Sequence, residues 1–401
     1  MNARLGEVCI DVIDSEHKTA PRAPIGAEFA VSVGTPHIRS GRLHLEDAVP
    51  VDRETYSQWT ARGIPEAGDL ILTREAPVGQ AGMIPAGTLV CLRQRTVLLK
   101  PDRRAVDGRF LLYLLVSPLM QERMHAGGVG STVAHLNIKD VRSLELGRLP
   151  RVDDQRAIAG VLGALDDKVA LNEQIAESSL ELAQALYDNA ASASTDWCEW
   201  KLKDAATWFS GGTPKTSEPS YWGGDIPWIS ASSLKTPWLD QSARSVTQLG
   251  VQHGTRLAPR GAILFVVRGM SLTQEFRIGV AQRELAFGQD CKALVPHPSV
   301  DSTALFLAIR SNSSKILEMV DLAGHGTGRL GTDRIANLVV RLPQGEFAAQ
   351  FTSGIDSLAR AAASAMEQNR TLATLRGTLL PQLITGKIRV KDATRVVEEA
   401  V

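Results

Sequence analysis

A long apolar stripe near the end of the chain constrains the fold more than any other feature. Apolar or small residues recur there at alternating steps of three and four, with one step stretched at the end. This spacing is typical of a long helix that packs along one face, and such a helix needs a partner. The stripe consists of Phe351, Ile355, Leu358, Ala362, Ala365, Asn369, Leu372 and Leu379.

A second stripe lies near the middle of the chain and supplies that partner. It follows Leu149-Pro150, just as the first stripe follows Leu342-Pro343, and it keeps strict steps of three and four. Its positions are Ile158, Leu162, Leu165, Val169, Asn172, Ala176, Ser179, Ala183 and Leu186. The many Ala and Ser positions indicate a close approach, so we expect two long helices that pair as an antiparallel coiled coil.

Each stripe carries one asparagine, Asn172 or Asn369, and each helix carries a glutamine five to seven residues after its proline, Gln155 or Gln350. A lone Asn on such a seam can be a tolerated polar residue. Two at matching places favour a pair that sets the register, because a buried amide is costly unless it meets another polar group. We therefore expect Asn172 to lie near Asn369.

The similarity between the two halves extends beyond the helices. Residues 68–74 (GDLILTR) are similar to 261–268 (GAILFVVR), and 126–136 (AGGVGSTVAHL) are similar to 323–330 (AGHGTGRL). The offset is about 190 to 200 residues throughout. A fixed offset of this kind indicates an internal repeat. The chain therefore contains two copies of one unit, and each copy is a globular lobe followed by a long helix.

We predict an α+β fold in which two globular lobes alternate with two long helices in a pseudo-twofold internal repeat. With 401 residues and 44% hydrophobic content, the chain can bury more than one core. The expected domains are a first lobe at 1–149, a helix at 150–195, a second lobe at 196–343, a helix at 344–390 and a tail at 391–401. Within the lobes, strands are expected at 69–73, 89–99 and 262–267, and helices at 108–124 and 302–319.

The sequence lacks the signature motifs of several functional classes. The only Gly-Lys pair, Gly386-Lys387, is followed by Ile388 rather than Ser or Thr, and no His-Glu-x-x-His occurs. The four cysteines lie far apart without a Cys-x-x-Cys pair, no charged-then-apolar leader opens the chain, and no apolar run approaches the length of a membrane span. We expect a reduced cytoplasmic protein with no membrane segment, no cofactor and no metal.

The charge is balanced overall but unevenly distributed. Residues 1–149 hold 18 basic and 17 acidic side chains, 196–343 hold 16 and 13, and 150–195 hold 3 and 8. The lobes are therefore mildly positive and the first helix is negative, a weak indication of nucleic-acid binding. Arginine outnumbers lysine by 32 to 12, which suits bidentate contacts with bases and phosphates but is also what a GC-rich genome produces.

Three stretches resemble a known family. They are LLPQLITGKIRV at 379–390, LPRVDDQRAIAGVLGALDDKVALNEQI at 149–175, and SGGTPKTSEPSYWGGDIPWISASSL at 210–234. Together with the alternation of lobe and helix, they make the chain similar to the specificity subunit of type I restriction-modification systems. The first lobe departs from the family pattern, since no Gly-Gly-Thr-Pro or Tyr-Trp precedes Thr35-Pro36.

The resemblance implies a non-catalytic reader of double-stranded DNA. Each lobe would read one half of a bipartite, asymmetric target, and the paired helices would act as a ruler. Two modification subunits would dock on the helices and methylate adenine, and restriction subunits would join to translocate and cut. A helix of about 35 residues is about 50 Å long, enough to span two major-groove sites roughly 34 Å apart.

We expect DNA contacts at loop and strand-end positions whose side chains can reach phosphates or guanine edges. They are Thr35, His37, Arg39, Arg74 and Arg95 in the first lobe, and Lys215, Ser230, Ser232, Arg268, Arg277 and Arg329 in the second.

Two other classes of protein stay open. One is a coiled-coil scaffold that reads no sequence. The other is an autonomous nuclease or methyltransferase, for which Asp196, Glu199 and Lys201 imitate part of a metal-dependent nuclease motif.

Overall fold

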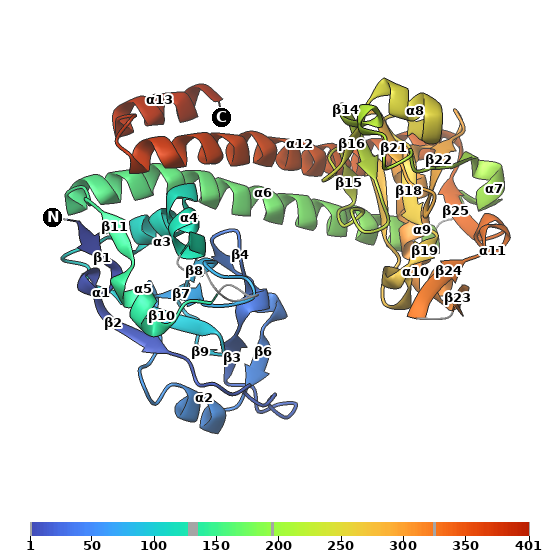
Figure 1. Cartoon of the computed structure of the whole chain (residues 1–401). Helices are drawn as coiled ribbons and strands as arrows, with labels where there is room; N and C mark the ends of the chain where they lie inside the picture. Colours follow the sequence, from blue (N-terminus) through green and yellow to red (C-terminus); the bar gives the residue numbers. More distant parts are fainter. Residues whose placement is uncertain (1, 127–134, 194–195, 324–325, 401) are drawn as a thin grey trace. The chain divides into compact units, whose positions relative to one another are not determined.

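The computed structural model describes residues 2–126, 135–193, 196–323 and 326–400. The chain divides into two compact units, Met1–Val169 with Arg370–Val401, and Ala170–Asn369. Each unit contains one lobe together with a segment of each long helix, α6 (Val152–Ala193) and α12 (Gly345–Ile384) (Figure 1). Both long helices are therefore shared between the units.

The first lobe is built around two small sheets. The larger has the order β2-β10-β7-β8, and the smaller, β6-β3-β9, contains the parallel pair β3 and β9. The strands of the larger sheet are β2 (Cys9–Asp14), β10 (Thr96–Pro101), β7 (Leu70–Thr73) and β8 (Ala81–Met83), and those of the smaller are β6 (Val49–Val51), β3 (Ala30–Val33) and β9 (Val90–Leu92). Two further pairs are β1 (Ala3–Arg4) with β11 (Glu145–Gly147), and β4 (Ile38–Arg39) with β5 (Arg42–Leu43). Its helices are α1 (Leu5–Val8), α2 (Arg53–Trp59), α3 (Gly108–Val116), α4 (Pro118–Ala126) and α5 (Ile138–Ser143).

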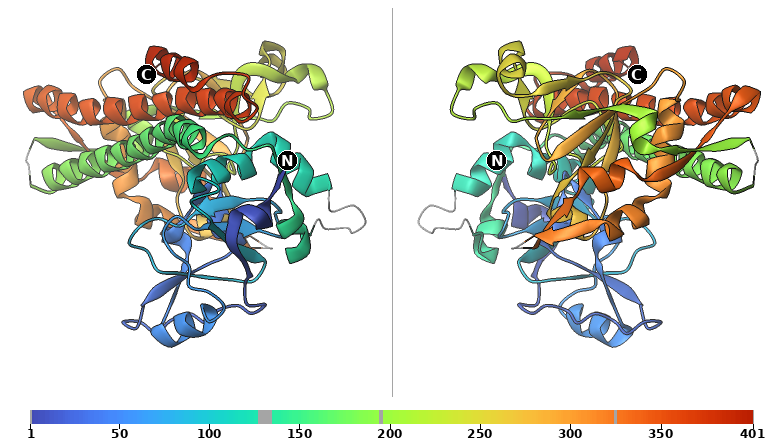
Figure 2. Two further views of the ribbon diagram at one scale, coloured as in Figure 1. Left: turned by 90° about the vertical axis from the view of Figure 1, so that its left-hand side faces the viewer. Right: turned by 90° about the vertical axis from the view of Figure 1, so that its right-hand side faces the viewer.

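The second lobe repeats this plan with additional strands. Both lobes combine strands with short helices (Figures 1 and 2). Its main sheet is β13 (Ala206–Ser210), β22 (Cys291–Pro296), β18 (Ile263–Val266), β20 (Ile278–Ala281) and β15 (Trp238–Leu239), in that order. A second sheet has the order β16 (Ser245–Val246), β14 (Trp222–Ile229), β21 (Leu285–Phe287) and β17 (Arg256–Ala258). A third sheet has the order β19 (Arg268–Gly269), β24 (Thr327–Leu330) and β23 (Val320–Ala323). In addition, β12 (Trp197–Lys201) pairs with β25 (Val339–Pro343). The helices are α7 (Leu202–Ala205), α8 (Gln248–Gly254), α9 (Ser302–Ser311), α10 (Ser313–Glu318) and α11 (Thr332–Ala336).

The two lobes match strand for strand in their central parts. The order β2-β10-β7-β8 corresponds to β13-β22-β18-β20, and the parallel pair β3 and β9 corresponds to β14 and β21. The internal repeat and the α+β class predicted from the sequence are confirmed. Residues 127–134 and 324–325, which belong to the two matching glycine-rich stretches, lie outside the described part of the chain.

Each unit has its own hydrophobic core. All four residues of β7, and likewise of β18, are buried, as expected for strands covered on both faces. Helix α3 is buried over six consecutive residues from Phe110 to Leu115, because it lies between the sheet and the long helices. Helix α9 takes the same place in the second unit.

The long helices run antiparallel. In the second unit Asn172 of α6 contacts Asn369 of α12, and Trp197, just beyond α6, contacts Phe351 near the beginning of α12. The seam positions that the structure buries include Ile158, Leu162, Leu165, Ala176, Ala183, Ile355, Ala362, Ala365, Leu372 and Leu379. The antiparallel coiled coil predicted from the sequence is confirmed.

The seam of α6 departs from the predicted positions near its end. Leu186 is exposed and Ser179 is half-buried, whereas Leu180 and Tyr187 are buried in their place. A straight helix has 3.6 residues per turn, so its buried face drifts away from a strict 3.5-residue repeat over several turns. The drift moves the seam by one residue.

Three further expectations about elements need correction. The helix predicted at 108–124 is two helices, because Ser117 precedes Pro118 and is extended. The helix predicted at 302–319 breaks at Asn312, whose amide donates to Ala308 O. The strand predicted at 89–99 is two strands, β9 and β10, with Arg95 left-handed in the turn between them.

The end of the chain continues beyond the second long helix. Helix α12 ends at Ile384, Gly386 has a φ of 69°, and the predicted tail forms helix α13 (Val390–Ala400). Ala393 of α13 is fully buried in the core of the first unit. Within the described residues, no helix is both long enough and apolar enough to cross a membrane.

Candidate nucleic-acid interface

Several loops of each lobe meet at one edge, which we call the loop edge. In the first lobe Arg93 N donates to Val33 O and Arg74 N donates to Arg95 O, both at 2.8 Å, and Glu75 pairs with His135 in a β-bridge. In a parallel pair such as β3 and β9 the carboxyl ends point the same way, so the loops that follow them are neighbours. The loop edge of the first lobe comprises 34–37, 74–75, 93–95 and 135.

The second lobe forms its loop edge from the corresponding residues. Gly288 N donates to Ile229 O and Val267 N donates to Asp290 O, both at 2.8 Å, and Arg268 pairs with Arg329 between β19 and β24. This loop edge comprises 230–233, 267–269, 288–290 and 328–329. The two lobes therefore present the same backbone feature with different side chains.

Most of the predicted contact residues lie at these edges. Thr35 and Arg95 belong to the first, and Ser230, Ser232, Arg268 and Arg329 belong to the second. Arg277 lies close to the second edge, since its carbonyl accepts from Val266 N at 3.1 Å, and its side chain pairs with Glu275.

Arg39 and Lys215 lie on other loops. Arg39 is in the β4–β5 hairpin and pairs with Asp47 at 3.0 Å, while Arg42 of the same hairpin donates to Asp166 O of α6 at 2.5 Å. Lys215 is exposed in the loop before β14, where its carbonyl accepts from Trp222 Nε1. The predicted set is therefore not one continuous surface.

His37 does not fit the predicted contact with DNA. Its side chain is only 5% exposed, and Nδ1 accepts a hydrogen bond from Gly34 N at 2.9 Å. Burial, helped by the nearby Arg93, lowers the pKa of the imidazole. In the second lobe Ser233 Oγ accepts from Ser230 N at 2.8 Å in the same way, so position 37 caps a turn.

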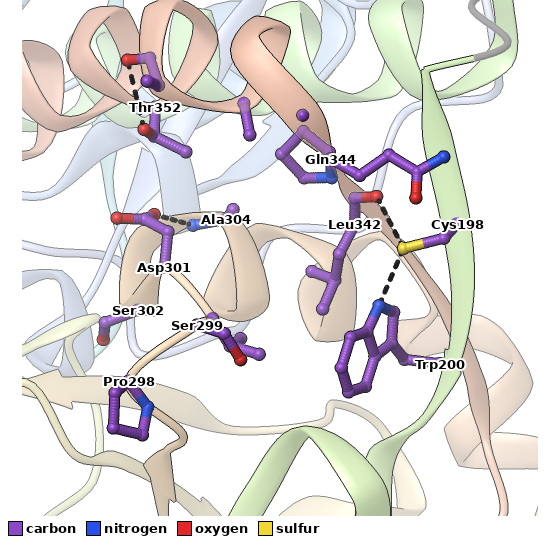
Figure 3. A pocket seen from close by; sticks show the side chains of 15 residues that line it. Cys198, Trp200, Pro298, Ser299, Asp301, Ser302, Ala304, Leu342, Gln344 and Thr352 are labelled. Atoms are coloured by element: carbon purple, nitrogen blue, oxygen red, sulfur yellow. Dashed lines mark hydrogen bonds between the residues drawn. The ribbon is translucent and has the colours of Figure 1, made fainter.

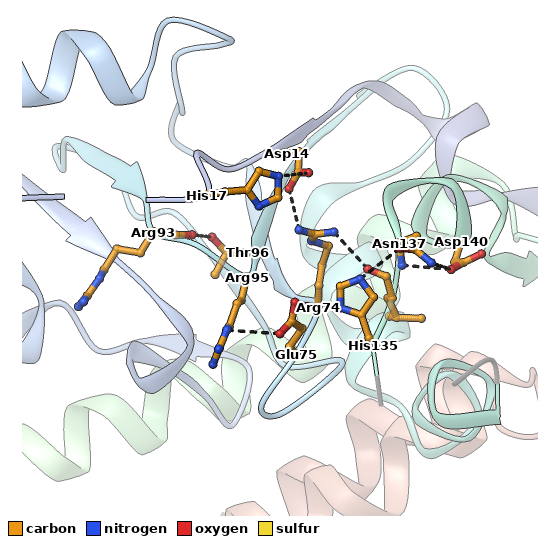
Figure 4. A network of polar contacts seen from close by, with 11 residues as sticks. Asp14, His17, Arg74, Glu75, Arg93, Arg95, Thr96, His135, Asn137 and Asp140 are labelled. Carbon is orange, nitrogen blue, oxygen red and sulfur yellow. Dashed lines mark hydrogen bonds and ion pairs between the residues drawn. The ribbon is translucent and has the colours of Figure 1, made fainter. Parts of the chain in front are cut away.

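Arg74 is also buried, contrary to the prediction of a contact with DNA. It is 5% exposed, its Nη2 lies 3.1 Å from Asp14 Oδ1, and its Nη1 donates to Leu136 O (Figure 4). The pairing of β10 with β7 and of β22 with β18 aligns Arg74 with Val267, not with Arg268. Glu75 is the residue that corresponds to Arg268.

The sequence reasoning missed Glu75 and His135. Glu75 lies between an arginine and a histidine, with Oε2 3.3 Å from Arg95 Nε and Oε1 2.9 Å from His135 Nδ1 (Figure 4). The only sequence signal for Glu75 was its place just after a buried strand, and the neighbouring Arg74 was the more obvious candidate for a contact with DNA. His135 follows a stretch that gives no local clue to its partner.

The second lobe carries a row of charges across β19, β24 and β23. In the strand register, Arg329 of β24 lies opposite Arg268 of β19 on one side and opposite Asp321 of β23 on the other. The carboxylate of Asp321 forms an ion pair with Arg334 at 2.8 Å. Like charges placed opposite each other are destabilising. Within the described ranges, neither Arg268 nor Arg329 has an ion pair, and both are exposed.

A serine turn lies beside this row. Ser230 Oγ and Ser232 Oγ share a hydrogen bond at 2.9 Å. A Cβ at Gly269 would lie 3.6 Å from Ala231 Cβ, so the turn is against the strand that carries Arg268. Hydroxyl groups beside two guanidinium groups are typical donors to phosphate oxygens.

The described residues can be compared with two arrangements that some enzymes use, a metal site and an activated thiol. They contain no group of three or more His, Cys, Asp and Glu side chains that could hold a metal ion. Burial raises the pKa of Cys9 and Cys291 to about 12 and that of Cys91 to about 11, so these thiols are poor nucleophiles.

A cavity of about 600 Å³ lies where the second lobe meets the beginning of α12 (Figure 3). Its lining includes Cys198, Trp200, Asp301 and Ala348. At the equivalent place in the first unit, Gln155 fills the space, accepting from Asp107 N at 2.9 Å and donating to Pro150 O at 3.0 Å. The cavity is thus a difference in packing between the two repeats.

Two lobes of one topology, each packed against segments of an antiparallel helix pair, define a duplicated α+β protein. The family model described as "Type I restriction modification DNA specificity domain" matches the chain twice, at 4–178 and 194–365. The chain therefore belongs to the type I restriction-modification DNA specificity family.

Individual relatives agree with this assignment. The EcoR124I/EcoR124II specificity subunit of Escherichia coli is 28% identical over 189 residues, covering 46% of this chain and 47% of the relative. The HindI specificity subunit of Haemophilus influenzae is 20% identical over 372 residues, covering 73% and 80%. The chain thus aligns with about half the length of the first of these relatives.

The fold is also found in a solved structure. The crystal structure of the type I restriction-modification S subunit from M. genitalium matches with a TM-score of 0.60 and 16% identity, covering 96% of this chain and 95% of that one. At this level of identity the match concerns the fold alone.

Proposed function

We propose that this chain is the DNA sequence-recognition subunit of a type I restriction-modification complex and that it acts in the cytoplasm without catalysing a reaction itself. The observation that carries the proposal is the pair of loop edges. They share one backbone plan but carry different polar side chains, as two readers of unlike half-sites require. The twofold match to a DNA specificity family supports it.

Each lobe reads one half of a bipartite, asymmetric target in double-stranded DNA. Thr35 and Arg95 in the first lobe, and Ser230, Ser232, Arg268, Arg277 and Arg329 in the second, contact phosphates or base edges. Arg39 and Lys215 lie on separate loops and contact phosphates only. The helix pair sets the spacing between the half-sites, and the contact between Asn172 and Asn369 fixes its register.

Methylation-site mapping tests this function directly. DNA from cells with the chain should carry adenine methylation at one bipartite sequence, and cells without the chain should lose it. Exchanging the second lobe for that of a relative should change one half of the sequence and leave the other half intact. Unchanged methylation without the chain contradicts the proposal and favours a scaffold that reads no sequence.

Helix α6 offers a docking face for the modification subunits, of which we propose two, with restriction subunits as further partners. Leu171, Ile175, Leu182 and Leu186 are 37–50% exposed and recur at steps of four, seven and four, so they form one stripe. Exposed apolar stripes of this kind mark protein interfaces.

Leu182→Asp tests this docking face. It should abolish co-purification of the chain with a modification subunit, because a charge at the centre of an apolar interface is costly to bury. Leu249→Asp on α8, where the side chain is 42% exposed, is the matched control and should leave association intact. Equal behaviour of the two variants would rule out the stripe as the docking face.

A further inference from the structure

We propose that the two lobes divide the work of DNA binding unequally. Arg268 and Arg329 at the loop edge of the second lobe are the phosphate anchor, whereas Glu75 at the loop edge of the first lobe accepts a hydrogen bond from an exocyclic amino group of a base. This inference rests on the proposed function and adds a role for each lobe.

The first argument is an exchange of charge at matched positions. The backbone bonds and bridges that define the two loop edges align three pairs of residues, and in two of these pairs an acid and a base have changed places. The matched pairs are Glu75 with Arg268, His135 with Arg329, and Arg95 with Asp290. Since the backbone is the same, the side chains alone make the edges different.

The second lobe's edge contains two arginines, Arg268 and Arg329, and one carboxylate, Asp290. Arg268 and Arg329 face each other across the ladder, and in the part of the chain that the structure describes no carboxylate binds either guanidinium. Their mutual repulsion is relieved when an anion binds between them. Guanidinium groups bind phosphate oxygens in bidentate fashion, and Ser230 and Ser232 add hydroxyl donors alongside.

At the first lobe's edge two of the three arginines, Arg74 and Arg95, are already paired with carboxylates. Glu75 binds Arg95 with one oxygen and His135 with the other, and Asp14 pairs with the buried Arg74. A cation that is already paired releases few counterions when DNA binds. Each oxygen of Glu75 has a second lone pair, so the carboxylate remains able to accept from cytosine N4 or adenine N6 in the major groove.

Salt-dependent binding of four variants tests the proposal. The full chain, together with its modification subunits, is bound to a duplex that carries the mapped methylation target and to a scrambled duplex over a series of salt concentrations. The variants are Arg329→Gln and Glu75→Gln, with Arg260→Gln and Glu66→Gln as matched controls. Arg260 is exposed in the turn before β18, and Glu66 pairs with Lys100 before β7, both away from the loop edges.

The two test variants should act in opposite directions. Arg329→Gln should weaken binding to both duplexes by a similar factor and make the slope of log K against log salt shallower by about one. Glu75→Gln frees Arg95, so it should tighten binding to the scrambled duplex, steepen the slope, and lower the preference for the target roughly ten-fold. The controls should match the wild type, and thermal unfolding should show that all four variants are folded.

Two results would overturn the proposal. One is an unchanged salt slope for Arg329→Gln. The other is a Glu75→Gln variant that keeps the full preference for the target. A wild-type complex that fails to prefer its mapped target instead contradicts the proposed function itself, whatever the variants do.

Discussion

At the scale of single residues, buried polar side chains are the most informative feature. Asn172 is 1% exposed, and its Nδ2 donates to Asn369 Oδ1 at 2.9 Å and to Gln368 Oε1 at 3.3 Å. The sequence suggested this contact, because two asparagines interrupt two otherwise apolar stripes at matching places. The burial of Arg74 was not predictable in this way, because its partner Asp14 lies sixty positions away and nothing local distinguishes a buried arginine from an exposed one.

The turn cap at His37 makes a prediction about pH. Burial lowers the pKa of the folded imidazole below its ordinary value near 6.5, so the unfolded chain binds the proton more readily. The contribution of His37 to stability is fully present above pH 6.5 and should be lost as the pH falls from there through the lower pKa of the folded imidazole. The unfolding temperature of the first unit should therefore drop between pH 7.5 and 5.

His37→Ser should reduce this drop, because serine supplies the same cap in the second lobe without a proton to gain. His125→Ser, at an exposed site on α4, is the control and should keep the pH dependence of the wild type. Unfolding followed by circular dichroism across that pH range measures both, and an equal drop in the two variants contradicts the assignment.

At the scale of elements, the sequence predicts strongly periodic segments well and their ends poorly. The stripes of α6 and α12 were clear because many positions support each of them. The break at Ser117 depends on a single proline that follows a long apolar run. The segment 261–268 is one residue longer than 68–74, and only the ladder register shows that the extra residue is at the end. That offset is why Arg268 was matched with Arg74 instead of Glu75.

The junction of α6 with the first lobe provides a prediction about stability. Gln155 is 1% exposed and satisfies Asp107 N and Pro150 O, so Gln155→Ala leaves two partly buried backbone groups without this partner. We expect a loss of about 1–3 kcal/mol in the free energy of unfolding of the first unit. Gln350→Ala is the control, since Gln350 is exposed at the corresponding stretch of α12 and should change stability by less than about 0.5 kcal/mol. Urea unfolding compares the two, and similar midpoints would show that the amide contributes nothing.

At the scale of the whole molecule, the repeat in sequence is not the same as the division into units. The sequence alternates lobe and helix, which suggests that each lobe folds with the helix that follows it. In the structure the first unit instead takes its last segment from Arg370 onward, and Leu372, Leu379 and Leu383 are buried in its core. A local pattern cannot reveal which distant segment completes a core.

Removing residues 370–401 should therefore damage the first unit and spare the second. The truncated chain would expose the apolar surface that Leu372, Leu379 and Leu383 cover, so proteases should cleave the first lobe much faster than in the full chain. Peptides from the second lobe should keep their protection in hydrogen exchange. Equal loss of protection in both lobes would mean that the units do not fold independently.

The completion of the first unit by the last segment has a consequence for synthesis on the ribosome. The first lobe emerges before residues 370–400, which cover its apolar surface, because the segment Ala170–Asn369 of the second unit is translated between them. The nascent chain must hold this lobe in an unfinished state while the second lobe is made. Translation of residues 370–400 is then the event that completes the first unit, so a product that stops before them should expose this lobe to cellular proteases.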